Sequence, residues 1–342
     1  NTKNFKALNE NTIFRELQKS GKQISMTNLI ALFKSDFITN YDPLKNYFEK
    51  LPAWDGKDHI KYLASFIEAK DKSFSLHLKK HLIRTVACAL DADYFNKQAF
   101  ILVHKKQNSG KSTFCRFLCP PNLKEYIAED ITTDKDSRIL LAKNLLINLD
   151  ELAMLSKKDI NSLKALLSKQ QINERLPYDR KNTILPRRCS FVGSTNETEF
   201  LNDETGTVRW LCFEIENIDW DYSKKVEINK VYAQAYHYYK NTEFDYNLTK
   251  NEILENEERN KKFQVLTIER ELIESYFLPD QNQHPANFRT ATEIMSRLNT
   301  INEKEFRLNR IQIGKALKTL KFPEGRDNTG RYGYYLIDVF QT

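Results

Sequence analysis

Glycine is scarce in this chain, with nine in 342 residues, so the positions of the few that occur carry information. Long apolar runs are absent altogether. No stretch approaches the ~18 uninterrupted apolar residues that a membrane-spanning helix requires. The sequence therefore predicts a protein without a membrane partner.

Cysteine is also sparse, and its pattern excludes two classes of small domain. The five cysteines are odd in number and scattered, and most lie in apolar context. A disulfide framework needs paired cysteines at regular spacing. Cys115 and Cys119 share a helix face, but no histidine or second cysteine pair accompanies them as a zinc site would require. We therefore expect buried, reduced thiols and a cytoplasmic location.

Composition and charge describe a globular protein with a weak preference for polyanions. Apolar residues make up 40% of the chain and charged residues 29%, and 53 Lys and Arg against 46 Asp and Glu give a net charge of +7. Such a balance favours a nucleic-acid partner only mildly. The length allows two or three domains. No signal peptide is visible and the first residue is Asn rather than Met, so we expect a fragment of something longer.

The most informative segment is 100–113, where an apolar strand enters a polar loop that closes on Gly-Lys-Ser-Thr. Strand, loop and helix in this order are typical of a phosphate-binding P-loop, in which backbone N–H groups face a triphosphate. Lys111 can then reach the outer phosphates, and the Ser112 hydroxyl can complete Mg²⁺ coordination. An ordinary polar turn also fits this short motif. The predicted ATP-binding residues are Gln107, Asn108, Ser109, Gly110, Lys111, Ser112 and Thr113.

A second motif follows about 40 residues later, where the apolar run 144–149 ends in Asp150 and Glu151. A buried parallel strand delivers such acids beside a nucleotide. We expect Asp150 to hold Mg²⁺ through water or through Ser112, and Glu151 to polarise the attacking water as general base. A strand running into a capped helix would give the same pattern. A third apolar run, 189–196, ends in Asn196, a candidate γ-phosphate sensor or a simple strand stop.

These motifs predict an α/β P-loop NTPase core of the AAA+ kind, flanked by other domains. We expect an N-terminal helical domain over 1–95 and the ATPase core over 96–216. A helical connector follows over 217–262. Its charge cluster Glu255 to Lys262 suggests a solvated helix.

The last segment, 263–342, reads as three helices and a glycine-rich basic hairpin, the outline of a winged helix. In such a module the third helix enters a DNA groove and the hairpin touches phosphates. A winged helix that packs against protein would have the same outline. The candidate DNA-binding residues here are Arg310, Lys315, Lys318, Arg326 and Arg331, and Lys321 belongs to the same basic cluster.

A family resemblance rests on the two motifs above together with the passages 41–43, 54–56, 175–178, 186–188, 193–196 and 205–210. Together they resemble the helicase part of the virulence-associated protein E family of phages and mobile elements, a family similar to superfamily 3 helicases and AAA+ ATPases. The segment around Gly314 and 332–335 resembles a C-terminal domain of Bacteroides-type members. The chain departs from the family in two places. Lys105 replaces the first P-loop glycine, and Val208 replaces an arginine that often precedes Arg209.

The resemblance implies a homo-oligomeric ring, expected to be a hexamer, with ATP at each interface. Arg209, thirteen residues past Asn196, would be an arginine finger for the neighbour's γ-phosphate. A surface arginine beside Trp210 is the alternative. Segment 173–183 would form a hairpin with the basic tip Arg180 and Lys181, projecting into the channel to hold one strand, unless it is a charged surface turn. A primase-like domain would precede residue 1.

The sequence therefore favours an ATP-dependent DNA helicase or translocase that binds single- and double-stranded DNA and uses ATP and Mg²⁺. An alternative is an ATP-controlled DNA-binding switch, such as an origin-recognition or defence ATPase, that does not unwind. A P-loop kinase for a small molecule is a third. It is disfavoured because Glu151 would activate water, which a kinase must exclude.

Overall fold

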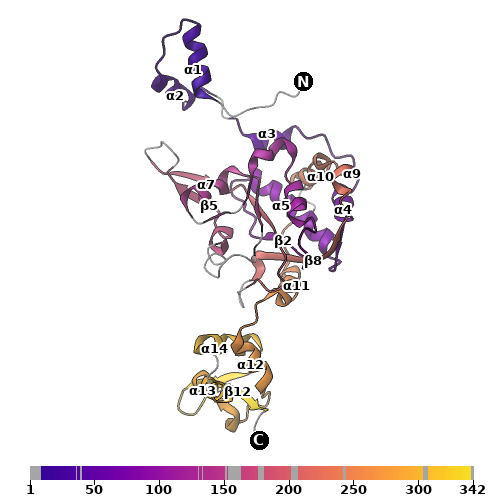
Figure 1. The fold of residues 1–342 in the computed structure, drawn as a ribbon, viewed down its shortest axis with the longest axis vertical. Helices are drawn as coiled ribbons and strands as arrows, with labels where there is room; N and C mark the ends of the chain where they lie inside the picture. Colours follow the sequence, from indigo (N-terminus) through magenta and orange to yellow (C-terminus); the bar gives the residue numbers. More distant parts are fainter. Residues whose placement is uncertain are drawn as a thin grey trace. The chain divides into compact units, whose positions relative to one another are not determined.

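The computed structural model describes residues 9–35, 37–38, 41–129, 131–132, 134–150, 152, 163–175, 181–201, 207–241, 244–302 and 307–339. The chain divides into two compact units, 1–49 and 50–342. Figure 1 colours the elements along the chain. The helices of the first unit are α1 (Glu10–Lys19), α2 (Met26–Phe33) and α3 (Pro43–Glu49).

The second unit begins with a mixed α/β region. Its helices are α4 (His59–Ala64), α5 (Phe74–Leu90), α6 (Lys111–Phe117), α7 (Lys135–Lys143), α9 (Tyr222–Lys225), α10 (Ile228–Lys240) and α11 (Lys250–Asn260). Its strands are β1 (Ile67–Ala69), β2 (Ala99–Val103), β3 (Ile127–Glu129), β4 (Leu146–Leu149), β5 (Gln171–Glu174), β6 (Thr183–Pro186), β7 (Ser190–Thr195) and β8 (Trp210–Ile218). The short 3-10 helices η1 (Pro121–Tyr126), η3 (Thr207–Arg209) and η4 (Lys261–Phe263) join them.

A six-stranded sheet in the order β1-β8-β2-β7-β4-β3 organises this region. The neighbours from β8 to β3 pair in parallel, and only β1 is antiparallel. Strands β2, β4 and β7 are buried along their whole length, as expected for parallel strands covered on both faces. Their carboxyl ends meet at one edge of the sheet. Strands β7, β4 and β3 lie on one side of β2 and β8 lies on the other, so the connections between strands change direction beside β2. Ligands bind outside such an edge in open α/β sheets.

Side chains alternate between two apolar layers because successive residues of a strand point to opposite faces. One layer contains Ile101, Ile147 and Phe191, packed with Leu141 of α7. On the other, Phe100 and Phe213 stack and contact Phe74 and His81 of α5. Helices α4, α5 and α10 pack together beside this layer (Figure 1).

The arginine of the 186–188 passage has a structural role. Arg187 is fully buried. Its guanidinium donates to the carbonyl oxygens of Leu167 and Asn96, both at 2.7 Å, and of Cys189 at 3.0 Å. The three oxygens lie at the end of the helical residues 163–167, shortly before β2 and directly before β7. Arg187 therefore fixes the path of the chain into β7, which carries Ser194 and is followed by Asn196.

Helix α11 differs from the solvated helix that its charges indicate. Asn256 and Asn260 are completely buried and donate to the Trp210 carbonyl at 2.9 and 2.7 Å. Arg259 lies 4.2 Å above the Phe213 ring and pairs with Asp71 at 2.8 Å. One polar face thus attaches α11 to the start of β8. Buried polar groups with partners are compatible with a stable interface.

The last part of the chain, from α12 to β12, folds around its own apolar cluster, and we call it the C-terminal unit. Its elements are α12 (Ile268–Tyr276), β9 (Phe277–Pro279), η5 (Pro285–Asn287), β10 (Phe288–Arg289), α13 (Ala291–Ile301), α14 (Arg310–Thr319), β11 (Glu324–Arg326) and β12 (Tyr332–Asp338). Strand β12 pairs with β10, β11 and β9. The cluster joins Ile273 of α12, Leu298 of α13, Leu317 of α14 and Leu336 of β12. Three helices and a hairpin therefore form one small unit, in the predicted order.

All five cysteines are free and buried. Burial raises the pKa of the Cys119 and Cys189 thiols to about 12 and also raises the pKa of the other three. Among the residues that the structure describes, no helix is long and apolar enough to cross a membrane.

Candidate nucleotide-binding site

The loop 104–110 lies between the buried strand β2 and helix α6. Asn108 and Gly110 both have positive φ angles, +54° and +88°. Left-handed residues occur in anion-binding nests, where alternation with right-handed residues turns successive N–H groups toward a common centre. Gly110 also begins α6, where the helix dipole favours negative charge. The loop can therefore receive phosphate oxygens.

The Lys111 side chain is folded back onto this loop. Its Nζ donates to the carbonyl oxygens of His104 and Lys106, both at 3.1 Å, and to the Ser109 hydroxyl at 3.0 Å. The residue is 7% exposed, and this burial lowers the pKa of its ammonium group. An arriving phosphate would give the ammonium a charged partner in place of neutral oxygens.

Ser112, Asp150 and Ser194 bring three oxygen-bearing side chains together from α6, the end of β4 and β7. Both hydroxyls donate to Asp150 Oδ1, Ser112 at 2.6 Å and Ser194 at 2.7 Å, and the two hydroxyl oxygens lie 2.9 Å apart. The register of β4 on β7 pairs Leu149 with Gly193. A Cβ on Gly193 would lie 2.6 Å from the Leu149 carbonyl oxygen, so only glycine permits this close approach.

Arg116 holds the other oxygen of the same carboxylate. Its Nη2 lies 3.1 Å from Asp150 Oδ2, and its Nε lies 2.8 Å from Glu129 at the end of β3. The Asn148 amide donates to the same Glu129 at 2.7 Å. The bond to Glu129 raises the pKa of the Arg116 guanidinium. Arg116 and Ser194 were not among the predicted site residues, because their roles depend on which strands are neighbours.

These side chains fit a magnesium ion. Mg²⁺ prefers oxygen ligands, and proteins commonly bind it through one or two carboxylates together with waters and substrate phosphates. Asp150 and the Ser112 hydroxyl supply such donors beside the loop. Within the described ranges, no group of three His, Cys, Asp or Glu side chains forms an alternative metal site.

Other predicted residues lie near this edge or outside the described residues. Asn196 directly follows β7 and is partly buried. Arg209, at the end of η3, donates from Nε to the Ser168 hydroxyl at 2.9 Å. Glu151 and Arg180 lie outside the described residues. Thr113 and Gln107 are exposed.

Strands β5 and β6 pair antiparallel and form the hairpin predicted over 173–183. Glu174 pairs with Thr183 at the loop end of the hairpin and binds Arg138 of α7 at 2.5 Å. Lys181, two residues before Thr183, is exposed near the same end. The Glu174–Arg138 ion pair thus attaches this end of the hairpin to α7.

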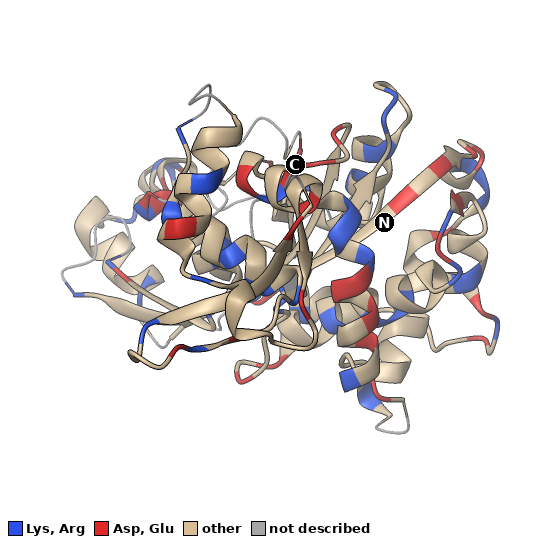
Figure 2. Cartoon of the chain, turned by 90° about the horizontal axis from the view of Figure 1, so that it is seen from below, with Lys and Arg blue, Asp and Glu red and all other residues tan. Residues whose placement is uncertain are grey.

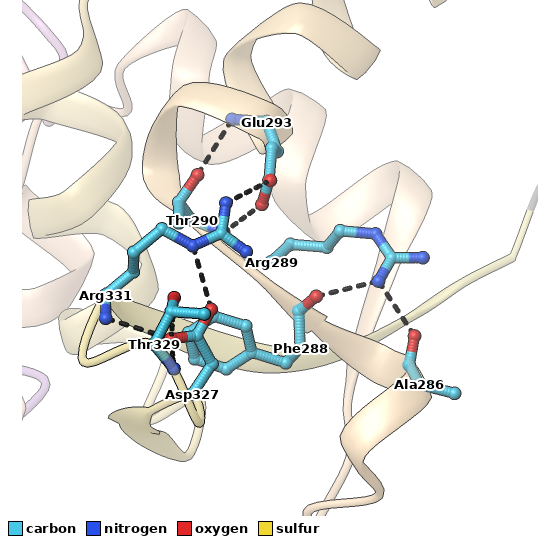
Figure 3. A network of polar contacts seen from close by, with 8 residues as sticks. All are labelled: Ala286, Phe288, Arg289, Thr290, Glu293, Asp327, Thr329 and Arg331. Carbon is cyan, nitrogen blue, oxygen red and sulfur yellow. Dashed lines mark hydrogen bonds and ion pairs between the residues drawn. The ribbon is translucent and has the colours of Figure 1, made fainter.

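The basic residues of the C-terminal unit differ in how they are held. Arg331 pairs with Asp327 at 2.8 Å and with Glu293 at 3.3 Å (Figure 3). The bond to Asp327 raises the pKa of Arg331. Lys318 pairs with Glu324 at 3.6 Å, and Arg326 donates to the Gly330 carbonyl at 2.9 Å. Arg310 and Lys315, both exposed on α14, form no ion pair with the residues that the structure describes.

Charge elsewhere is mixed. Lysines and arginines are interspersed with acids along the ribbon (Figure 2), as the near balance of 53 and 46 implies. Overall charge alone therefore does not identify a nucleic-acid surface.

Comparisons with known proteins identify one family. The model of the virulence-associated protein E-like domain matches residues 48–265. No curated protein matches the chain. Among solved structures, the apo structure of the NrS-1 C-terminal region (305–718) is similar with a TM-score of 0.49 and 13% identity, over 85% of this chain and 78% of that one. An A-form apo structure of the same region gives 0.46 and 15%, over 80% of this chain and 65% of that one.

Proposed function

Because the chain belongs to the family of the virulence-associated protein E-like domain, we propose that it is an ATP-dependent DNA helicase or translocase of a phage or mobile element. The observation that carries this proposal is the cluster of Ser112, Asp150 and Ser194 beside the 104–110 loop. The loop supplies anion-binding geometry, and the cluster supplies oxygen ligands for a metal. Nucleoside triphosphate hydrolysis requires both together.

Region 96–216 is then a P-loop ATPase core. Loop N–H groups and Lys111 bind the phosphates, and Ser112 with Asp150 holds Mg²⁺. The ion, when bound, neutralises phosphate charge. Arg116 and Ser194 orient the Asp150 carboxylate by occupying its two oxygens. Glu151, next in sequence, accepts a proton from the attacking water, and Asn196 senses the γ-phosphate at the end of β7.

Arg209 completes the site of a neighbouring subunit in a homo-oligomeric ring, which we expect to be a hexamer. A cation offered to the γ-phosphate stabilises charge that develops in the transition state. The hydrogen bond to Ser168 holds the side chain near the surface in a partly buried position. The ring would form part of a longer chain with a primase-like domain, acting in the cytoplasm, where thiols stay reduced.

The C-terminal unit acts as a winged helix on duplex DNA. The order helix, short strand, helix, helix, hairpin supports this assignment. Exposed Arg310 and Lys315 on α14 are the stronger phosphate ligands, because they have no competing acid among the described residues. The other three basic residues already have partners within the C-terminal unit, and these contacts would have to break before they could bind DNA phosphates. They are Lys318, Arg326 and Arg331. The β5–β6 hairpin, through Arg180 and Lys181, holds single-stranded DNA.

A DNA-binding switch that hydrolyses ATP without unwinding would use the same site. Strand displacement separates the two functions, since only a motor releases the annealed strand. A small-molecule kinase would show no stimulation by DNA.

The decisive experiment measures ATP hydrolysis with and without single-stranded DNA at low and moderate salt. We expect stimulation by DNA. Lys111→Ala should abolish ATP binding, because no other cation of the loop reaches the phosphates. Glu151→Gln should retain ATP binding and lose turnover, because an amide is not a general base. Turnover of Glu151→Gln at close to the wild-type rate would refute the assignment of the base. Lys57→Ala, which changes an exposed lysine outside the predicted site residues, serves as control.

A further inference from the structure

Strand β8 extends beyond its neighbour at the carboxyl edge of the sheet. The last residue of β2, Val103, pairs with Glu214, and β8 continues for four more residues to Ile218. At about 3.3 Å per residue, this extension carries the chain roughly 13 Å past the point where the 104–110 loop begins. Strand β1 pairs with the extension through Ile67 and Ile218, so its position is fixed.

The turn that follows is fastened to α6. The Asp219 N–H donates to the Phe66 carbonyl at 2.8 Å. Tyr222 is buried, and its ring packs edge-on against Phe114 and Phe117 of α6 at 5.3 and 4.9 Å. Because α6 starts at the loop, the contacts of Asp219 and Tyr222 hold Trp220, which lies between them in the chain, beside the loop.

The Trp220 indole lies directly on Gly110. A Cβ added to Gly110 would come within 2.8 Å of the indole Cζ2 and 3.0 Å of Cη2. Any other residue at position 110 would therefore displace the ring, in addition to being strained by the φ of +88°. Even so, Trp220 remains 51% exposed. A large apolar ring is thus seated on the candidate phosphate loop with half of its surface open.

We propose that Trp220 is the stacking platform for the base of the nucleoside triphosphate. This inference rests on the proposed function, since it assumes that the phosphates bind the 104–110 loop. An indole offers a flat π face and binds bases without reading their hydrogen-bonding groups. The site therefore prefers purines, which have the larger stacking area, over pyrimidines. It discriminates little between adenine and guanine.

The test compares ATP, CTP and inorganic triphosphate as ligands of the whole chain. Triphosphate carries the charge without the base, so the ratio of its dissociation constant to that of ATP measures the contribution of the nucleoside. Stacking on an aromatic side chain is worth about 1–3 kcal/mol by alanine substitution, a factor of about 5 to 150. Trp220→Ala should therefore weaken ATP binding by at least fivefold and leave triphosphate binding unchanged.

Two further variants keep the test independent of folding. Trp220→Leu retains an apolar cover on Gly110 but no π face, and should behave as Trp220→Ala does. Trp220→Phe should retain most of the preference for ATP over CTP. Phe37→Ala removes an aromatic ring that is 90% exposed and should change nothing. ATP should also quench a part of the tryptophan fluorescence that is missing from Trp220→Phe.

The outcomes separate the two proposals. Loss of both ATP and triphosphate binding in Lys111→Ala supports the phosphate site, and a wild-type chain that binds neither ligand refutes the proposed function. If wild type binds both while Trp220→Ala and Trp220→Leu keep the wild-type ratio of ATP to triphosphate affinity, the phosphate site stands and the stacking role of Trp220 is wrong.

Discussion

Ser194 influences the candidate metal site through a single hydroxyl group. It shares Asp150 Oδ1 with Ser112. Ser194→Ala removes one of the two hydroxyl donors without adding volume. Because residues that orient metal ligands typically change affinity by 10- to 100-fold, we expect about a tenfold rise in the Mg²⁺ concentration for half-maximal ATP hydrolysis. A magnesium titration at saturating ATP measures it.

The matched control is Ser65→Ala, an exposed serine at the end of α4 whose hydroxyl donates to the Tyr62 carbonyl. It should leave the magnesium dependence unchanged. An unaltered titration for Ser194→Ala would show that the hydroxyl has no part in orienting Asp150.

The sequence identified some residues of this site and not others. Lys111, Ser112 and Asp150 were predicted because each follows a recognisable local pattern, and the structure brings Ser112 and Asp150 into contact. Ser194 was visible in the Gly193 to Asn196 passage, but its partner depends on the register of β4 on β7. The position of Trp220 depends on how far β8 extends past the end of β2, which the periodicity of the sequence does not reveal. Glu151 stays a prediction.

At the scale of elements, helix α5 presents two buried histidines to the sheet. Both ring nitrogens of His77 lack hydrogen-bond partners among the described residues. Burial, helped by the nearby Arg259 and Arg84, lowers the pKa of His77 to about 4. Burial also lowers the pKa of His81 well below its usual value. The folded state therefore contains neutral rings.

This arrangement predicts acid-sensitive stability. An unfolded histidine has a pKa of about 6.5, so it binds a proton that folded His77 does not. Its contribution is present above pH 6.5 and is lost as the pH falls toward 4. From the pKa values of about 6.5 and about 4, we expect His77 alone to cost about 2 kcal/mol of unfolding free energy at pH 5 relative to pH 8. Urea unfolding at both pH values measures it.

His77→Phe should reduce this pH dependence, because the replacement ring contacts Phe213 as His77 does and cannot ionise. The exposed His284 is the control, and His284→Asn should retain the wild-type pH dependence. Equal pH dependence in wild type and His77→Phe would mean that other groups dominate acid unfolding.

Elements were predictable where apolar patterns are strong and less so where polar groups are buried. The parallel strands and the β5–β6 hairpin follow from short apolar runs and a polar turn. The sequence predicts a solvated helix α11 because Asn256 and Asn260 are residue types that usually lie on the surface. In the structure both side chains donate to the Trp210 carbonyl. Strand β1, three residues long, lies within a region predicted as helical. Such a short strand is specified by its partner β8 rather than by its own sequence.

At the scale of the whole molecule, the C-terminal unit is expected to supply duplex DNA binding independently of ATP hydrolysis. Deleting residues from 267 onward removes Arg310 and Lys315 but none of the nucleotide-site residues. Duplex affinity should fall, and the slope of log K against log salt should decrease by roughly 0.9 for each DNA phosphate that the shortened chain no longer binds. Basal ATP hydrolysis should persist. Fluorescence anisotropy at several salt concentrations measures the slope.

The matched variants separate the two predicted DNA surfaces. Arg310→Ala with Lys315→Ala should reproduce part of the loss on duplex DNA. Arg180→Ala with Lys181→Ala should instead weaken single-strand binding and its stimulation of hydrolysis. Lys45→Ala with Lys61→Ala, two exposed lysines, should affect neither. Unchanged duplex affinity and salt slope after the deletion would favour a protein-contact role for the C-terminal unit.

The burial of all five thiols has a practical consequence for probing this protein. Alkylating reagents attack the thiolate, and burial both hides the sulfur atoms and keeps them protonated. A maleimide dye should therefore leave the native wild-type chain unlabelled. A cysteine introduced at an exposed position such as Lys181 would then react alone, without removal of the native cysteines. Distances between dyes on neighbouring copies would report directly on assembly.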